Sequence, residues 1–296
     1  MEEAISLERS SAEWPFDEGP TVQLGYQLFW SADIERGREV FQELERAATA
    51  RNDPAAESEA LWFLGFLAWR AGDWEQAERY IADSLMLLTQ LGALMPPDEF
   101  PAAVIAAHRG RIGDARAIAH GALARAKGEG IRIAESGHGW VLGFAELSLG
   151  DANAALVHLR RSYEIRNAFM LEPAQRLELG DLLEALIAVG ELDEADEILA
   201  IWQERAAVLD RAWALAILAR CRALLLAARG DLGGAFGSFE HALAEHARST
   251  DPFHHGRTLL ALGRTQRRAK RRGAARTTLE EAVAAFERLG APRWSH

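Results

Sequence analysis

The sequence is poor in the features that mark secreted and membrane-spanning proteins. It has a single cysteine, Cys221, which excludes an internal disulfide and favours a reducing compartment. No apolar run approaches the ~20 residues that a membrane-spanning helix needs, and the run that begins at Trp213 ends before Arg220. The first residues are acidic, whereas a secretory signal begins with basic residues and an apolar run. We therefore expect a cytoplasmic chain with no membrane partner.

Catalytic and metal-binding motifs are also missing. The sequence has no phosphate-binding loop of the G-x-x-x-x-G-K-[ST] type and no cysteine and histidine spacing suited to zinc. The adjacent His254 and His255 are a metal candidate, but a solvated pair in the first turn of a helix explains them better. Adjacent carboxylates such as Glu280 and Glu281 fit ordinary positions in the early turns of a helix. We expect a protein that is not an enzyme and that uses no cofactor or metal.

The charge is distributed unevenly along the chain. The net charge is −11, yet from Asp251 onward ten Lys and Arg stand against four Asp and Glu, a balance of +6. The preceding 250 residues carry 23 basic against 40 acidic residues, a balance of −17. Such an acidic body repels phosphates, so direct binding of nucleic acid is not expected. The basic run over residues 267–272 is either a solvated turn between two helices or a docking point for an acidic partner.

A repeat of about 40 residues runs through the sequence. Six alanines are separated by steps of 38, 40, 40, 40 and 40 residues: Ala77, Ala115, Ala155, Ala195, Ala235 and Ala275. Five positions before each of the first five alanines stands a glycine, and the sixth has Lys270 instead. A fixed period of this length indicates a stacked array, in which each unit buries its apolar face on its neighbours.

Each unit resembles a tetratricopeptide repeat (TPR), a pair of antiparallel helices. In one unit, Leu64-Gly65 and Ala77 are small-residue points of close helix approach, Gly72 breaks the first helix and Asp73 caps the second. We predict an all-α, right-handed α-solenoid of about seven TPR-like pairs over residues 19–294, with residues 1–18 an N-terminal extension or the remnant of a preceding repeat. The predicted first helices lie near residues 19–31, 55–71, 97–109, 132–149, 173–189, 211–229 and 251–269, and their partners near 33–51, 73–91, 111–127, 151–168, 191–208, 231–248 and 271–289.

The first helices of a TPR solenoid line its concave face, and here their inward positions fall into two zones. The aromatic zone comprises Tyr26, Phe29, Trp30, Trp62, Phe66, Trp69, Phe100, Trp140 and Phe144, and its rings either fill the groove or bind a ligand. The basic zone comprises Arg220, Arg257, Arg264, Arg267 and Arg268, with Glu184 between the two zones. A buried guanidinium needs an acceptor, so a ligand with an apolar body and an anionic end would satisfy both zones. We predict a ligand or partner site at Trp140, Phe144, Glu184, Arg220, Arg257, Arg264 and Arg267.

The C-terminal part of the chain resembles one particular protein family. The string from Arg257 to Arg268, followed by Leu279-Glu280, by residues 286–291 and by Trp294, is similar to the last repeat of the large ATP-binding LuxR-type transcriptional regulators of the maltose-activator sort. The resemblance implies a bacterial sensor region that binds an effector (a small molecule, peptide or protein) and relays its presence to ATPase and helix-turn-helix domains absent from this chain. It also adds Trp213 to the site.

The alternative interpretation is a free-standing TPR scaffold or peptide receptor that mediates protein–protein interaction. Self-association as a homo-oligomer is compatible with both interpretations. A reading frame that continues into a helix-turn-helix after Trp294 would favour the LuxR-type sensor, and a natural stop codon at His296 would favour the scaffold.

Overall fold

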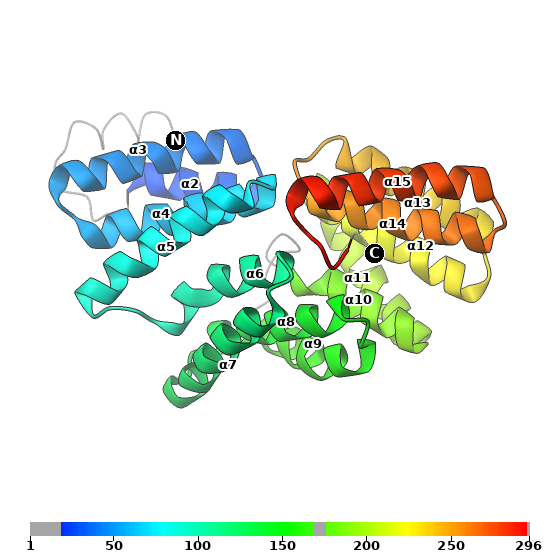
Figure 1. Cartoon of the computed structure of the whole chain (residues 1–296), viewed down its shortest axis with the longest axis horizontal. Coiled ribbons are helices and arrows are strands. Elements are labelled where there is room, and N and C mark those ends of the chain that lie inside the picture. The colour runs from blue at the N-terminus through cyan, green and yellow to red at the C-terminus, as the bar shows by residue number, and fades with distance from the viewer. Residues whose placement is uncertain (1–18, 169–175, 295–296) are drawn as a thin grey trace. The chain divides into compact units, whose positions relative to one another are not determined.

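A computed structural model describes residues 19–168 and 176–294 (Figure 1), so the expectation for residues 1–18 lies outside the described residues. Over the described ranges the chain forms 14 α-helices and one short 3₁₀ turn, with no strand, which confirms the predicted all-α helical-repeat class. The helices are α2(Pro20–Ser31), α3(Ile34–Arg51), α4(Pro54–Ala71), α5(Trp74–Leu91), α6(Phe100–His108), α7(Ile112–Glu129), α8(Arg132–Ser148), α9(Ala152–Asn167), α10(Glu178–Val189), α11(Leu192–Leu209), α12(Ala212–Arg229), α13(Leu232–His246), α14(Pro252–Arg268) and α15(Arg272–Leu289).

Most predicted helix ends fall within a few residues of the observed ones, because glycine stops and aspartate caps are local signals. Helix α4 ends at Ala71 and is capped by Gly72, whose φ of 87° lies in the left-handed region that favours glycine. Lys270, which replaces this glycine in the last repeat, adopts the same region with φ 61°. Asp73 then caps α5 by accepting a hydrogen bond from the Gln76 N–H at 3.2 Å. The main differences are α10, which begins at Glu178 and not near residue 173, and α6, which begins at Phe100 after a 3₁₀ turn over Pro96–Glu99.

Close packing within the helix pairs explains the repeated small residues. A Cβ atom on Gly65 would lie 2.5 Å from Cδ1 of Ile81, and one on Gly143 would lie 2.5 Å from Cγ of Leu159. The ladder residue Ala77 is fully buried in the same contact. The Leu-Gly and alanine positions are therefore points where two helices approach too closely for larger side chains.

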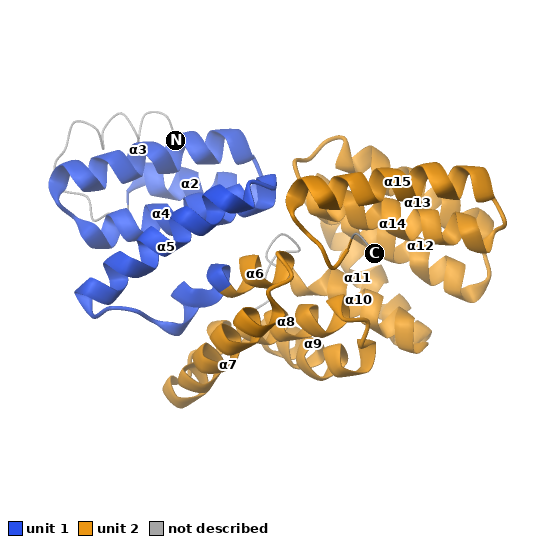
Figure 2. Ribbon diagram, in the orientation of Figure 1, with its two compact units in different colours: residues 1–102 blue, residues 103–296 orange. Residues whose placement is uncertain are grey.

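The chain divides into two compact units, residues 1–102 and residues 103–296 (Figure 2). In the first unit, rings from α2, α3 and α4 form an aromatic cluster. Phe41 stacks on Phe63 with centroids 4.6 Å apart, and Trp62 stacks on Phe66 at 5.4 Å. Phe29, at 1% exposure, contacts three of these rings. In this unit the aromatic zone packs largely against itself.

The second unit carries its first helices in one layer. Helix α8 contacts α10, α10 contacts α12, and α12 contacts α14, while α9, α13 and α15 each pack against the first helix of their own pair. This layer brings residues far apart in sequence next to one another, and it holds the candidate site. Among the described residues no helix is both long and apolar enough to cross a membrane.

Candidate functional site

Four charged side chains from three first helices form a buried network in the second unit. Arg220 on α12 donates through Nε to Oε1 of Glu184 on α10, at 2.7 Å. Arg257 on α14 donates through Nη2 to Oε2 of Glu184 at 2.7 Å, and through Nη1 to Oδ1 of Asp181 at 2.6 Å. The indole Nε1 of Trp140 on α8 donates to Oδ2 of Asp181 at 2.7 Å. One hydrogen-bonded network thus joins α8, α10, α12 and α14.

The network is internally neutral. Arg220 is fully buried, and Arg257 and Asp181 are each 2% exposed. Burial by itself raises the pKa of Glu184, but the guanidiniums of Arg257 and Arg220 outweigh it and hold this pKa below its usual value. Burial likewise lowers the pKa of Arg257, but Glu184 and Asp181 reverse the effect and raise it. Asp181 and Glu184 therefore supply each of the two buried arginines with a carboxylate acceptor from within the chain.

A histidine completes the surroundings of Arg220. Nη1 of Arg220 donates to the backbone oxygen of His254 at 3.2 Å and lies 3.4 Å from its ring Nδ1. Burial, reinforced by the positive charge of Arg220, lowers the pKa of His254 well below its usual value, so the ring is neutral. The expectation of a solvated histidine pair is thus wrong for His254. No cluster of three or more metal-binding side chains occurs within residues 19–168 and 176–294.

Aromatic rings surround the guanidinium of Arg257. Its central carbon lies 4.7 Å from the ring centroid of Trp294, 5.9 Å from that of Phe253 and 6.0 Å from that of Phe144. Phe144 also stacks on Trp294, with centroids 6.0 Å apart, and on the buried His108 at 4.3 Å. Arg257 is therefore held by two carboxylates on one side and by ring faces on the other.

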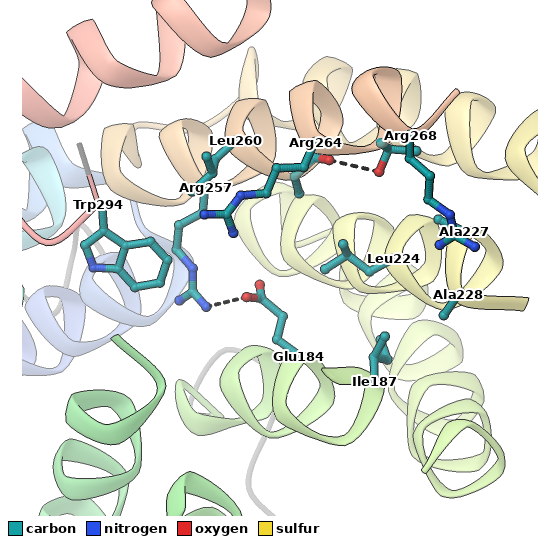
Figure 3. A pocket seen from close by; sticks show the side chains of 12 residues that line it. Glu184, Ile187, Leu224, Ala227, Ala228, Arg257, Leu260, Arg264, Arg268 and Trp294 are labelled. Carbon is teal, nitrogen blue, oxygen red and sulfur yellow. Dashed lines mark hydrogen bonds and ion pairs between the residues drawn. The ribbon is translucent and has the colours of Figure 1, made fainter. Parts of the chain in front are cut away.

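An open pocket of about 310 Å³ lies beside this network, between α10, α12 and α14 (Figure 3). Glu184 and Arg257, joined by their ion pair, form one end of it together with Trp294. Arg264 and Arg268 line its α14 side. The remaining lining is mainly aliphatic: Ile187, Leu224, Ala227, Ala228, Leu260, Ala261 and the side chain of Thr265.

The other predicted site residues lie apart from this pocket. Trp213 is 3% exposed on α12 and lines a separate cavity of about 10 Å³ beside Arg176. Arg267 is exposed on α14 but is not part of the pocket wall, whereas Arg264 is. The structure thus brings Trp140, Phe144 and the four charged groups of the network together, and places Trp213 and Arg267 elsewhere. A ligand-binding role for any of these residues stays a prediction.

Sequence reasoning missed two residues that define the site. Asp181 lies three positions before Glu184 on the same helix face, a spacing that could have suggested a joint acceptor for two arginines. Trp294 was noticed only through the family resemblance, yet it packs on Arg257 and lines the pocket. Its contacts come from residues 144, 253 and 286, and no local pattern in the sequence predicts them.

Known structures share this fold. No family model and no curated protein sequence matches the chain. A Rap protein complexed with competence and sporulation factor aligns with 91% of this chain and 74% of its own, at a TM-score of 0.74 and 14% identity. The Rap conjugation gene regulator of the plasmid pLS20, in complex with the Phr* peptide, aligns with 90% and 72%, at 0.73 and 16%. The apo form of RapI aligns with 90% and 75%, at 0.51 and 11%. At these identities the likeness is one of fold, a TPR-like helical repeat.

Proposed function

We propose that this chain is a TPR-like receptor that binds a peptide or a short segment of a partner protein. The observation that carries the proposal is the open pocket on the first helices α10, α12 and α14, which combines an aliphatic lining with charged groups. Its volume of about 310 Å³ is at the lower end of the ~300–1,000 Å³ range of ligand pockets, and suits a few side chains of an extended segment. Two proteins with the same fold were solved in complex with competence and sporulation factor and with the Phr* peptide, which supports a ligand of this class.

The chemistry of the network favours binding over catalysis. Both oxygens of Glu184 accept from guanidiniums, and both oxygens of Asp181 accept from Arg257 and Trp140. Guanidinium and indole donors thus occupy every oxygen of the two carboxylates, which favours a structural role for them over proton transfer. The network therefore links α10, α12 and α14 to one another at one end of the pocket.

A second candidate function is the sensor region of a LuxR-type ATPase regulator. The observation in its favour is that Arg257 and Trp294, both within the string that resembles the last repeat of those proteins, are in direct contact next to the pocket. A ligand there would touch the segment that leads toward any following domain. Sequencing the reading frame beyond His296 tests this candidate: an encoded helix-turn-helix supports it, and a stop codon favours the free-standing receptor.

The test of the receptor proposal is selection from a display library of random hexapeptides on the immobilised chain. The Leu224→Trp variant fills the pocket from α12, and Val208→Trp adds the same ring at a position on α11 that is 82% exposed. Thermal unfolding of both variants confirms that they are folded. We expect wild type and Val208→Trp to enrich the same peptides and Leu224→Trp to lose them. Equal enrichment by all three proteins would place binding elsewhere, and no enrichment on wild type would end the receptor proposal.

A further inference from the structure

The charges around the pocket divide into a balanced group and an unbalanced one. Asp181, Glu184, Arg220 and Arg257 pair with one another, so their formal charges cancel. Arg264 and Arg268 line the same pocket, and neither has an acidic partner within residues 19–168 and 176–294. The pocket therefore presents two positive charges that nothing in the described part of the chain neutralises.

The two unbalanced arginines are placed to act on one ligand. Arg264 and Arg268 are four positions apart on α14, so they stand on the same face of the helix. In Figure 3 the Arg264 side chain extends toward the Arg257 end of the pocket, whereas that of Arg268 points toward Ala227 and Ala228. Aliphatic side chains lie between these two guanidiniums. The arrangement matches a ligand whose apolar part is flanked by negative groups.

The charge distribution of the rest of the chain also favours a negatively charged ligand at this pocket. The first 250 residues carry a balance of −17, so an acidic ligand is repelled by most of the molecule and attracted at the C-terminal basic zone. Charge complementarity of this kind fixes where a partner docks and suppresses partners of the wrong sign. A basic peptide would face Arg257, Arg264 and Arg268 together, with Glu184 already bound by two guanidiniums.

From these observations we infer that the pocket between α10, α12 and α14 selects acidic peptide segments, with carboxylates bound by Arg264 and Arg268 and an aliphatic side chain packed on Leu224 and Leu260. The inference rests on the proposed receptor function and adds to it the charge class of the ligand. The forked guanidinium group matches the geometry of a carboxylate. Because Arg264 and Arg268 are partly open to solvent, each ion pair should contribute about as much binding energy as an exposed ion pair does.

The experiment compares charge preference between wild type and variants in the same hexapeptide display selection. The test variant is Arg264→Gln with Arg268→Gln, and the matched control is Arg276→Gln, which removes an arginine of α15 that pairs with Glu280 away from the pocket. We expect wild type and the control to enrich peptides rich in Asp and Glu. A selected acidic peptide, titrated by fluorescence polarisation, should bind the double variant about tenfold more weakly, and its Glu→Gln analogue should bind both proteins alike.

The outcomes separate the inference from the function on which it rests. Acidic enrichment that disappears in the double variant but not in Arg276→Gln supports the inference. Enrichment of neutral or basic peptides that is lost in Leu224→Trp would uphold the receptor and overturn the acidic preference. Acidic enrichment that survives in the double variant would likewise overturn the assignment to Arg264 and Arg268. Thermal unfolding that matches wild type excludes misfolding as the cause of any loss.

Discussion

Replacing Glu184 by glutamine is the most direct test of the buried network. The carboxylate accepts one hydrogen bond from Arg220 and one from Arg257, both 2.7 Å long. Glutamine keeps the shape but removes the charge, so two buried guanidiniums remain with Asp181 as their only nearby carboxylate in the network. Removal of one member of a buried ion pair costs about 3–5 kcal/mol, because it leaves an uncompensated buried charge. We expect Glu184→Gln to lower the free energy of unfolding by about that amount.

The assay is urea unfolding followed by far-UV circular dichroism, with the slope of the transition compared between variants. The Arg220→Met substitution restores neutrality in the Glu184→Gln background, so the double variant should be destabilised by less than the sum of the single variants. The coupling should be about 2 kcal/mol, within the range measured for residues that share one network. Glu280→Gln, which removes the exposed partner of Arg276, should leave the transition unchanged. A loss below about 1 kcal/mol for Glu184→Gln, or additive single effects, would refute the reasoning.

Two further predictions concern helix packing and pH. Gly143→Ala should destabilise the chain by about 1–3 kcal/mol in urea unfolding, because its Cβ would overlap Leu159, whereas Gly237→Ala, with open space around it, should be neutral or slightly stabilising. Burial lowers the pKa of His108 and of His246 to about 3. The unfolded chain, with histidine pKa values of about 6.5, binds more protons between pH 6.5 and 3, so stability falls as the pH drops through that window. From pH 7 to 5.5 these two rings should cost about 2.5 kcal/mol; a flat profile of unfolding free energy would contradict their burial as neutral groups.

Helix pairs were predictable because their signals are local. Gly72 and Asp73 specify a left-handed turn and a cap within adjacent positions, and the same chemistry recurs every 40 residues. The beginning of α6 was less predictable because the proline-rich stretch Pro96–Glu99 forms its own 3₁₀ turn before the helix starts. Local signals of this kind fix where a helix begins and ends, but not which side chains meet across neighbouring pairs.

The candidate site was only partly predictable for that reason. The repeat pattern predicts that Glu184, Arg220 and Arg257 face inward. Which of them pair with one another depends on the orientation of α10, α12 and α14 about their own axes, which the pattern does not specify. Asp181 was missed because the repeat frame marks Glu184 as the inward position of α10 and says nothing of the carboxylate three residues before it. Because Asp181 was overlooked, the sequence suggested that the buried arginines need an acceptor from a ligand. Asp181 is one of the acceptors within the chain, and it accepts a hydrogen bond from Arg257 at 2.6 Å.

The arginines of α14 therefore differ in burial, although the sequence presents them as one basic zone: Arg257 is buried, whereas Arg264 and Arg268 are exposed. Arg257 lies near the start of the helix, where Asp181 and Glu184 of α10 are within reach, so its charge is used to hold the helices together. Arg264 and Arg268 lie two and three turns further on, opposite Ile187 and the alanines of α12. Among the residues that line the pocket, Glu184 is the one carboxylate, and it is already paired with Arg220 and Arg257. A guanidinium that faces an aliphatic wall gains little from its own chain. Its favourable interactions must come from solvent or from an anion that enters the pocket, and only the second of these distinguishes one ligand from another.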